Sequence, residues 1–140
     1  MGEWGPKCIL VGYDGSEGSR MAADLAATVA SKFGAKVVVM TSFKHQSRTI
    51  EPGAKATREI EEAHEMADYM VKHLTDKGLD AEKDVLEGPA SDALLTVAKV
   101  RNVELIVVGS RGLNPVRELL LGSTSEKVVR HAGVPVLIAR

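Results

Sequence analysis

Short apolar runs that alternate with segments of helical periodicity are the feature of this sequence that most restricts its fold. Continuous apolar stretches such as Val37–Met40 suit strands that are buried on both faces, as the strands of parallel sheets are. Five strands are expected at residues 8–14, 37–40, 81–86, 104–108 and 134–138, with helices at 16–32, 55–77, 90–101 and 123–131 between them. This alternation predicts a five-stranded parallel sheet in a doubly wound α/β/α sandwich, with helices on both faces.

The ends of these segments carry signals of their own. Ser16 is a suitable N-cap for the first helix, and Gly34 suits the end of that helix. Pro89 suits the first turn of the third helix. Residues 81–86 alternate more than the other strands, which indicates a strand with one wetter side at an edge of the sheet.

The composition fits one globular domain and argues against several classes of function. With 140 residues, 44% hydrophobic and 26% charged, the chain is expected to form a single domain over residues 1–140. The net charge of −1 does not indicate a nucleic-acid-binding surface. No apolar run approaches the ~18 residues of a membrane-spanning helix, and no signal peptide is evident. Cys8 is the single cysteine, so we expect a cytoplasmic protein in which it is a small core residue.

The residues that follow the expected strands are the first candidates for a ligand site. In open α/β sheets, ligands bind outside the carboxyl ends of the strands, at the point where the strand order reverses. The candidate segments are Asp14–Ser16, Thr41–Phe43, Glu87–Gly88 and the stretch from Gly109 onward.

The stretch from Gly109 onward carries the strongest chemical signal. Gly109-Ser110-Arg111-Gly112 follows a buried strand, and after nine intervening residues Gly122-Ser123 stands at the expected start of a helix. Glycines let backbone N–H groups approach phosphate oxygens closely, and a helix start offers free N–H groups and the positive end of its dipole. The Ser123 hydroxyl can donate a further hydrogen bond, and Arg111 can add positive charge. These residues therefore favour a polyphosphate ligand.

The spacing Gly-x2-Gly-x9-Gly-Ser resembles the ATP-binding signature of the universal stress protein family. The similarity extends over nearly the whole chain and includes the first strand with Asp14, the Leu-Leu-Leu-Gly-Ser block and the ending Val134–Ile138. The family includes members that bind ATP and members that lack these glycines, and this chain resembles the binding class. The resemblance implies an adenine nucleotide alpha hydrolase-like fold, a stress-response or regulatory role, and ATP held with Mg²⁺ or Mn²⁺.

The resemblance also implies a set of nucleotide contacts. Asp14 matches an acidic residue on the ribose and adenine side, and the backbone of Ser42 matches a contact to adenine. Tyr13 stands where many members have a smaller residue. The full expected set is Gly12, Tyr13, Asp14, Ser42, Val108, Gly109, Arg111, Gly112, Gly122, Ser123 and Thr124. No catalytic residue and no metal-ligating residue is expected.

Simpler interpretations of the same residues remain open. Ser123 and Glu126 have the spacing of a capping box, which needs no ligand. Asp14 alone is also typical of a turn or an N-cap. The four histidines (His45, His64, His73 and His131) show no metal-ligand pattern and are expected at the surface. The glycines at 12, 15 and 18 do not have the spacing of a dinucleotide-binding motif, and the P-loop motif is absent.

Three functions stay in view. A nucleotide-responsive binding module is the first, because no water-positioning base is evident beside the glycine segment and phosphoryl transfer needs one. A slow ATPase or an adenylylating enzyme is the second, and a cyclic AMP-binding relative is the third. A phosphoacceptor response regulator is disfavoured because it would need an acidic pair after the first strand.

Assembly is a separate expectation. Val134–Ile138 is apolar and is expected at a sheet edge, where exposed backbone groups invite pairing with another strand. Members of the universal stress protein family, which this chain resembles, commonly dimerise through this final strand. A homodimer through the C-terminal strand is therefore predicted.

Overall fold

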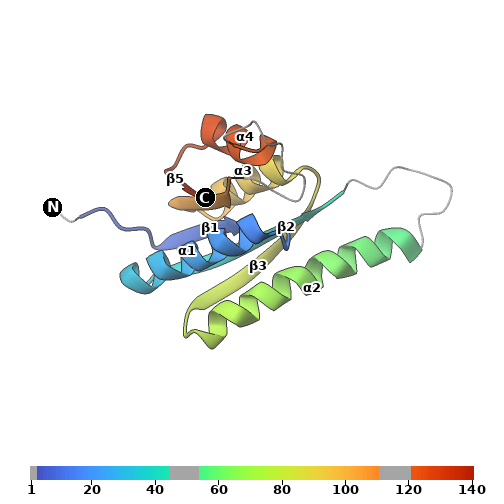
Figure 1. The fold of residues 1–140 in the computed structure, drawn as a ribbon, viewed down its shortest axis with the longest axis horizontal. Helices are drawn as coiled ribbons and strands as arrows, with labels where there is room; N and C mark the ends of the chain where they lie inside the picture. The colour runs from blue at the N-terminus through green and yellow to red at the C-terminus, as the bar shows by residue number, and fades with distance from the viewer. Residues whose placement is uncertain (1–2, 45–53, 111–120) are drawn as a thin grey trace.

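The computed structural model describes residues 3–44, 54–110 and 121–140, and in these residues strands and helices alternate (Figure 1). The elements are β1 (Cys8–Gly12), α1 (Glu17–Phe33), β2 (Lys36–Phe43), α2 (Ala54–Asp76), β3 (Asp80–Glu87), α3 (Ala90–Val100), β4 (Leu105–Gly109), α4 (Ser123–His131) and β5 (Val136–Ala139). The predicted order of elements is confirmed. The final strand begins at Val136, two residues later than expected.

The strands form one parallel sheet with the order β3-β2-β1-β4-β5. The chain builds the sheet outward from β1 to β3 and then crosses to β4 on the other side of β1. The strand order therefore reverses between β1 and β4, which is where such sheets bind ligands. β3 lies at one edge, as its alternating sequence predicted, and β5 lies at the other.

Helices cover both faces of the sheet and enclose two apolar cores (Figure 1). Alternate residues of each central strand point to opposite faces. In β2, Val37 and Val39 pack with α1 and α2, whereas Val38 and Met40 pack with α3 and α4. This double burial explains the continuous apolar runs. Of the helices in the described residues, none is long and apolar enough to cross a membrane.

The helix ends show how local sequence sets the element boundaries. Ser16 caps α1, because its Oγ accepts the Ser19 N–H at 3.2 Å. Gly34 ends the same helix with a φ of 67°, a left-handed conformation that suits glycine. Pro89 differs from the prediction, because it is the N-cap residue of α3 and lies just before the first turn.

Candidate functional site

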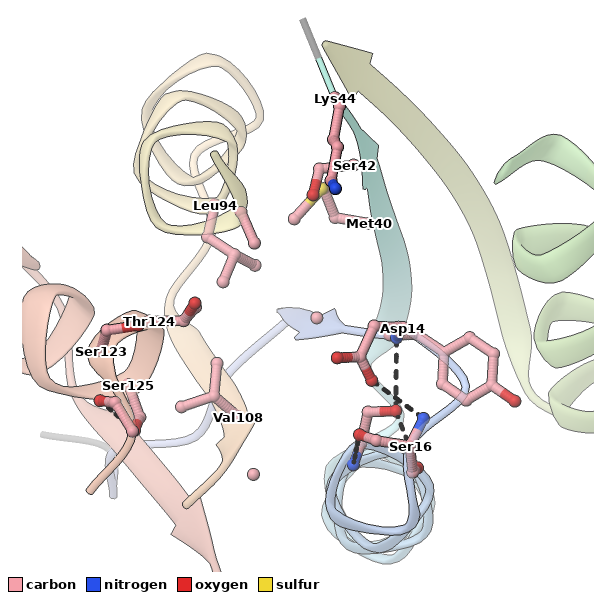
Figure 2. A pocket seen from close by; sticks show the side chains of 16 residues that line it. Asp14, Ser16, Met40, Ser42, Lys44, Leu94, Val108, Ser123, Thr124 and Ser125 are labelled. Carbon is pink, nitrogen blue, oxygen red and sulfur yellow. Dashed lines mark hydrogen bonds between the residues drawn. The ribbon is translucent and has the colours of Figure 1, made fainter. Parts of the chain in front are cut away.

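A cavity of about 460 Å³ opens at the carboxyl ends of β1 and β4 (Figure 2). It lies at the reversal of strand order, so the fold positions it where the sequence analysis predicted a site. The first turn of α4 and the side of α3 form one wall, and β2 and the β1–α1 turn form the other. The lining residues are Gly12, Tyr13, Asp14, Ser16, Ser19, Met40, Ser42, Lys44, Ala90, Leu94, Val108, Gly109, Gly122, Ser123, Thr124 and Ser125.

The β1–α1 turn presents Asp14 to the cavity (Figure 2). Its Oδ1 accepts the backbone N–H of Ser16 at 2.9 Å, and its own N–H donates to Ser19 Oγ at 3.2 Å. Gly15 completes the turn with a φ of 80°, which an L side chain rarely adopts. The turn interpretation of Asp14 is confirmed. The carboxylate that closes the turn is also an acceptor at the edge of the cavity.

The end of β4 brings Val108 and Gly109 to the cavity. A Cβ atom at Gly109 would lie 2.7 Å from the backbone C and O atoms of Gly18 in α1. Glycine is therefore needed at position 109 because α1 packs closely against the end of β4 there. This packing role was not foreseen from the sequence, where Gly109 was interpreted only through phosphate approach.

The start of α4 faces the cavity without a side-chain cap. Gly122 is the N-cap residue, and no side chain of the described residues caps this helix. Ser123 is thus the first helical residue, so the capping-box interpretation with Glu126 is wrong. The N–H groups of the first turn have no intrahelical acceptor. Together with the hydroxyls of Ser123 and Thr124, they form a donor-rich end of the cavity.

The remaining predicted contacts differ in what they present. A Cβ atom at Gly12 would lie 3.3 Å from Leu94 Cδ1, so this glycine keeps room in the cavity. Ser42 lines the cavity near the end of β2.

Tyr13 is 4% exposed and belongs to the core that packs with α1 and α2. Its backbone is held by hydrogen bonds from its N–H to Met40 O at 2.9 Å and from Thr41 Oγ1 to its carbonyl at 3.0 Å. The predicted contacts Arg111 and Gly112 lie outside the described residues.

Several lining residues were missed in the sequence analysis. Met40 and Leu94 are almost fully buried, and with Val108 they form an apolar part of the wall (Figure 2). Lys44 follows β2, and Figure 2 shows its side chain on the same side of the cavity as Ser42 and Met40. The position of Lys44 just after a strand was an available signal. Nothing in the local sequence distinguishes Leu94 from the other apolar residues of α3.

Other candidate groups lie away from the cavity. Cys8 is half-buried beside the core under α3 and α4, and burial raises the pKa of its thiol. His73 lies 3.9 Å from a carboxylate oxygen of Asp24 on the surface between α1 and α2. Within residues 3–44, 54–110 and 121–140, no group of three or more His, Cys, Asp or Glu side chains is arranged to hold a metal ion.

The chain is similar over nearly its whole length to proteins of one family. The model of the universal stress protein family matches residues 6–140. A relative in Thermus aquaticus, the universal stress protein in the QAH/OAS sulfhydrylase 3′ region, is 37% identical over 139 residues, covering 96% of this chain and 98% of the relative.

Solved structures of such proteins share the fold. The universal stress protein UspA from Lactobacillus plantarum superposes with a TM-score of 0.87 at 21% identity, over 99% of this chain and all of that chain. A universal stress protein solved in complex with cAMP superposes with a TM-score of 0.75 at 28% identity, over 98% of this chain and 99% of that chain. The matching family model, the 37% identity and the shared fold lead to one conclusion: this chain belongs to the universal stress protein family.

Proposed function

We propose that this protein binds an adenine nucleotide, ATP with Mg²⁺ or Mn²⁺, in the cavity between β1 and β4. The observation that carries the proposal is the pairing of two unlike surfaces in one cavity. One is an apolar wall of Met40, Leu94 and Val108, and the other is the uncapped start of α4. An apolar wall suits a purine base, and a helix start suits phosphates.

The dimensions and the polar groups of the cavity support this ligand. Its volume of about 460 Å³ lies within the range of about 300–1,000 Å³ that is usual for small-molecule sites. The Asp14 carboxylate can accept hydrogen bonds from ribose hydroxyls. The first-turn N–H groups of α4 and the hydroxyls of Ser123 and Thr124 can donate to phosphate oxygens. The divalent cation would be bound through the phosphates, which is the usual mode for Mg²⁺ with nucleotides.

Binding without demanding chemistry is the role that these residues favour. The described side chains lining the cavity include Asp14 as the carboxylate and Lys44 as the cation, and no histidine. Asp14 is already engaged by the Ser16 N–H. A nucleotide-responsive stress or regulatory module therefore fits better than a fast ATPase or an adenylylating enzyme. Sustained release of phosphate or AMP, well above that of a cavity variant, would favour the enzyme instead.

Cyclic AMP is the second candidate ligand. The structure at 28% identity that was solved with cAMP favours it, because that protein shares this fold over almost its full length. A competition experiment monitored by calorimetry, in which ATP and cAMP compete for the same site, shows which of the two binds with higher affinity. ATP is preferred here because a triphosphate uses more of the donors at the start of α4.

The double variant Gly122→Val/Ser123→Ala tests the site. Gly122 has φ −73° and ψ 169°, a conformation that valine adopts without strain, so the fold should persist. The valine side chain is expected to block close approach of phosphate to the helix start and to abolish ATP binding in calorimetry.

The matched control is Gly133→Val/Ser31→Ala, which makes the same two substitutions at exposed positions far from the cavity. This control should bind ATP as the wild type does. Equal ATP affinity of the cavity variant and the wild type would refute the assignment.

A homodimer through β5 is the assembly that we propose. β5 is an edge strand of apolar residues, and Val136, Leu137 and Ile138 are only half-buried in the single chain. Pairing of β5 with β5 of a second copy would cover this edge.

A further inference from the structure

One of the residues that line the cavity, Ser125 in the first turn of α4, has a buried hydroxyl. Ser125 is 2% exposed. Its Oγ lies 3.1 Å from the carbonyl oxygen of Ser110 and 3.1 Å from that of Gly122, and it donates to these acceptors. The hydroxyl thus points toward the backbone of the protein, and it joins the start of α4 to the residue that follows β4.

Ser110 is the meeting point of three backbone segments. Its carbonyl oxygen accepts the Gly122 N–H as well as the Ser125 hydroxyl. Its own N–H donates to the carbonyl oxygen of Ala139, at the end of β5, at 2.9 Å. The first turn of α4 is therefore fastened through one residue to the end of the β4–β5 pair.

We infer that Ser125 is a positioning residue for the phosphate end of the site, a role that rests on the proposed function. The first-turn N–H groups of α4 can bind phosphate only if they are held in a common direction toward the cavity. The Ser125 hydroxyl and the Gly122 N–H hold that turn from behind, at Ser110. Nucleotide phosphates are bound by the turn, while Ser125 acts through the Ser110 carbonyl.

The test compares ATP with adenosine, which lacks phosphates, by calorimetry. Ser125→Ala is expected to weaken ATP binding about tenfold, the effect of one lost hydrogen bond at the upper end of its usual range, and to leave adenosine binding unchanged. Ser125→Cys keeps the shape of the side chain with a weaker donor, so it should show an intermediate loss. Ser91→Ala is the control, because Ser91 is also a buried serine in the first turn of a helix, α3, and does not line the cavity.

The outcomes separate this inference from the proposed function. A wild type that binds neither ATP nor adenosine overturns both. A wild type that binds ATP, with Ser125→Ala binding it equally well, overturns the inference alone. An equal loss of ATP and adenosine affinity also overturns it, because that result marks a general effect on the fold.

A second measurement needs no nucleotide. Amide hydrogen exchange at Gly122 reports the bond to Ser110 directly, and it should be faster in Ser125→Ala and Ser125→Cys than in the wild type. Exchange in the centre of β4, at Val107, should not change. Unaltered exchange at Gly122 would contradict the positioning role even if ATP affinity fell.

Discussion

Single glycines at the cavity serve distinct physical purposes. The position of a Cβ at Gly12 faces Leu94, so a side chain there would enter the cavity. The position of a Cβ at Gly109 instead faces the backbone of Gly18, on the α1 side of the sheet. Two residues from similar sequence contexts, each at the end of a buried strand, thus protect the ligand space and the helix packing respectively.

Gly109→Ala is predicted to destabilise the fold. The added methyl group would lie 2.7 Å from backbone atoms of Gly18, so strand or helix must shift. Overpacking of this kind usually costs about 1–3 kcal/mol. Urea unfolding should show a lower midpoint than the wild type.

The control for this prediction is Gly133→Ala, since a Cβ there meets no atom within 4 Å. That variant should be neutral or slightly stabilising. Equal urea midpoints for Gly109→Ala and the wild type would show that the fold does not depend on the close contact between β4 at Gly109 and α1 at Gly18.

At the scale of elements, β5 is one of the two edge strands, and it pairs with another strand, β4, on one side only in the described residues. The carbonyl oxygens of Pro135 and Ala139 accept hydrogen bonds from β4 and from Ser110 beyond it. Since backbone groups of successive residues in a strand point to opposite sides, the N–H and C=O groups of Val136 and Ile138 face the open edge. These are the groups that a second copy of β5 would use.

Ile138→Pro is therefore predicted to convert the proposed homodimer to a monomer. Proline removes an N–H that faces the open edge and leaves the hydrogen bonds to β4 intact. Light scattering at micromolar concentration should show the change in mass. Leu137→Ala, which keeps all backbone donors, should remain dimeric. A monomeric wild type, or a dimeric Ile138→Pro, would rule out assembly through this edge.

At the scale of the whole molecule, the cavity exists because the sheet is wound in two directions. The crossover from β3 through α3 to β4 carries the chain to the other side of β1. α1 follows β1 and α4 follows β4, and these two helices pack on opposite faces of the sheet (Figure 1). The cavity therefore opens at the ends of these two neighbouring strands. Any ligand that binds there contacts residues from both halves of the chain.

Because the ligand would contact both halves, ATP is predicted to stabilise the whole domain. A ligand at 100 times its dissociation constant raises the free energy of unfolding by about 2.7 kcal/mol. For a domain of this size each kcal/mol raises the melting temperature by roughly 2–4 °C. ATP should therefore raise the melting temperature of the wild type by several degrees in a thermal melt. An equal rise in Gly122→Val/Ser123→Ala would show that the stabilisation arises elsewhere.

The expected contacts show where inference from sequence was adequate and where it was not. Asp14, Ser42 and Gly122 could be placed at the cavity because each follows an expected strand or stands at an expected helix start, whereas Val108 was expected only through the family resemblance. Leu94 and Met40 could not, because an apolar residue has the same local pattern whether it faces a core or a ligand. The capping-box interpretation failed for a related reason. A capping box needs Ser123 as the N-cap residue, whereas α4 begins one residue earlier, with Gly122 as the N-cap, and the sequence is the same in both cases.

The sequence by itself determined the order of elements, the parallel sheet and the edge position of β3. These follow from periodicity and turn residues, which act over a few neighbours along the chain. Only the tertiary structure decided that Gly109 packs on Gly18, that Leu94 closes against Gly12, and that Ser125 reaches the Ser110 carbonyl. Such contacts join segments that are far apart in the sequence. The distances between the contacting atoms depend on how the helices pack on the sheet, and no local sequence pattern predicts this packing.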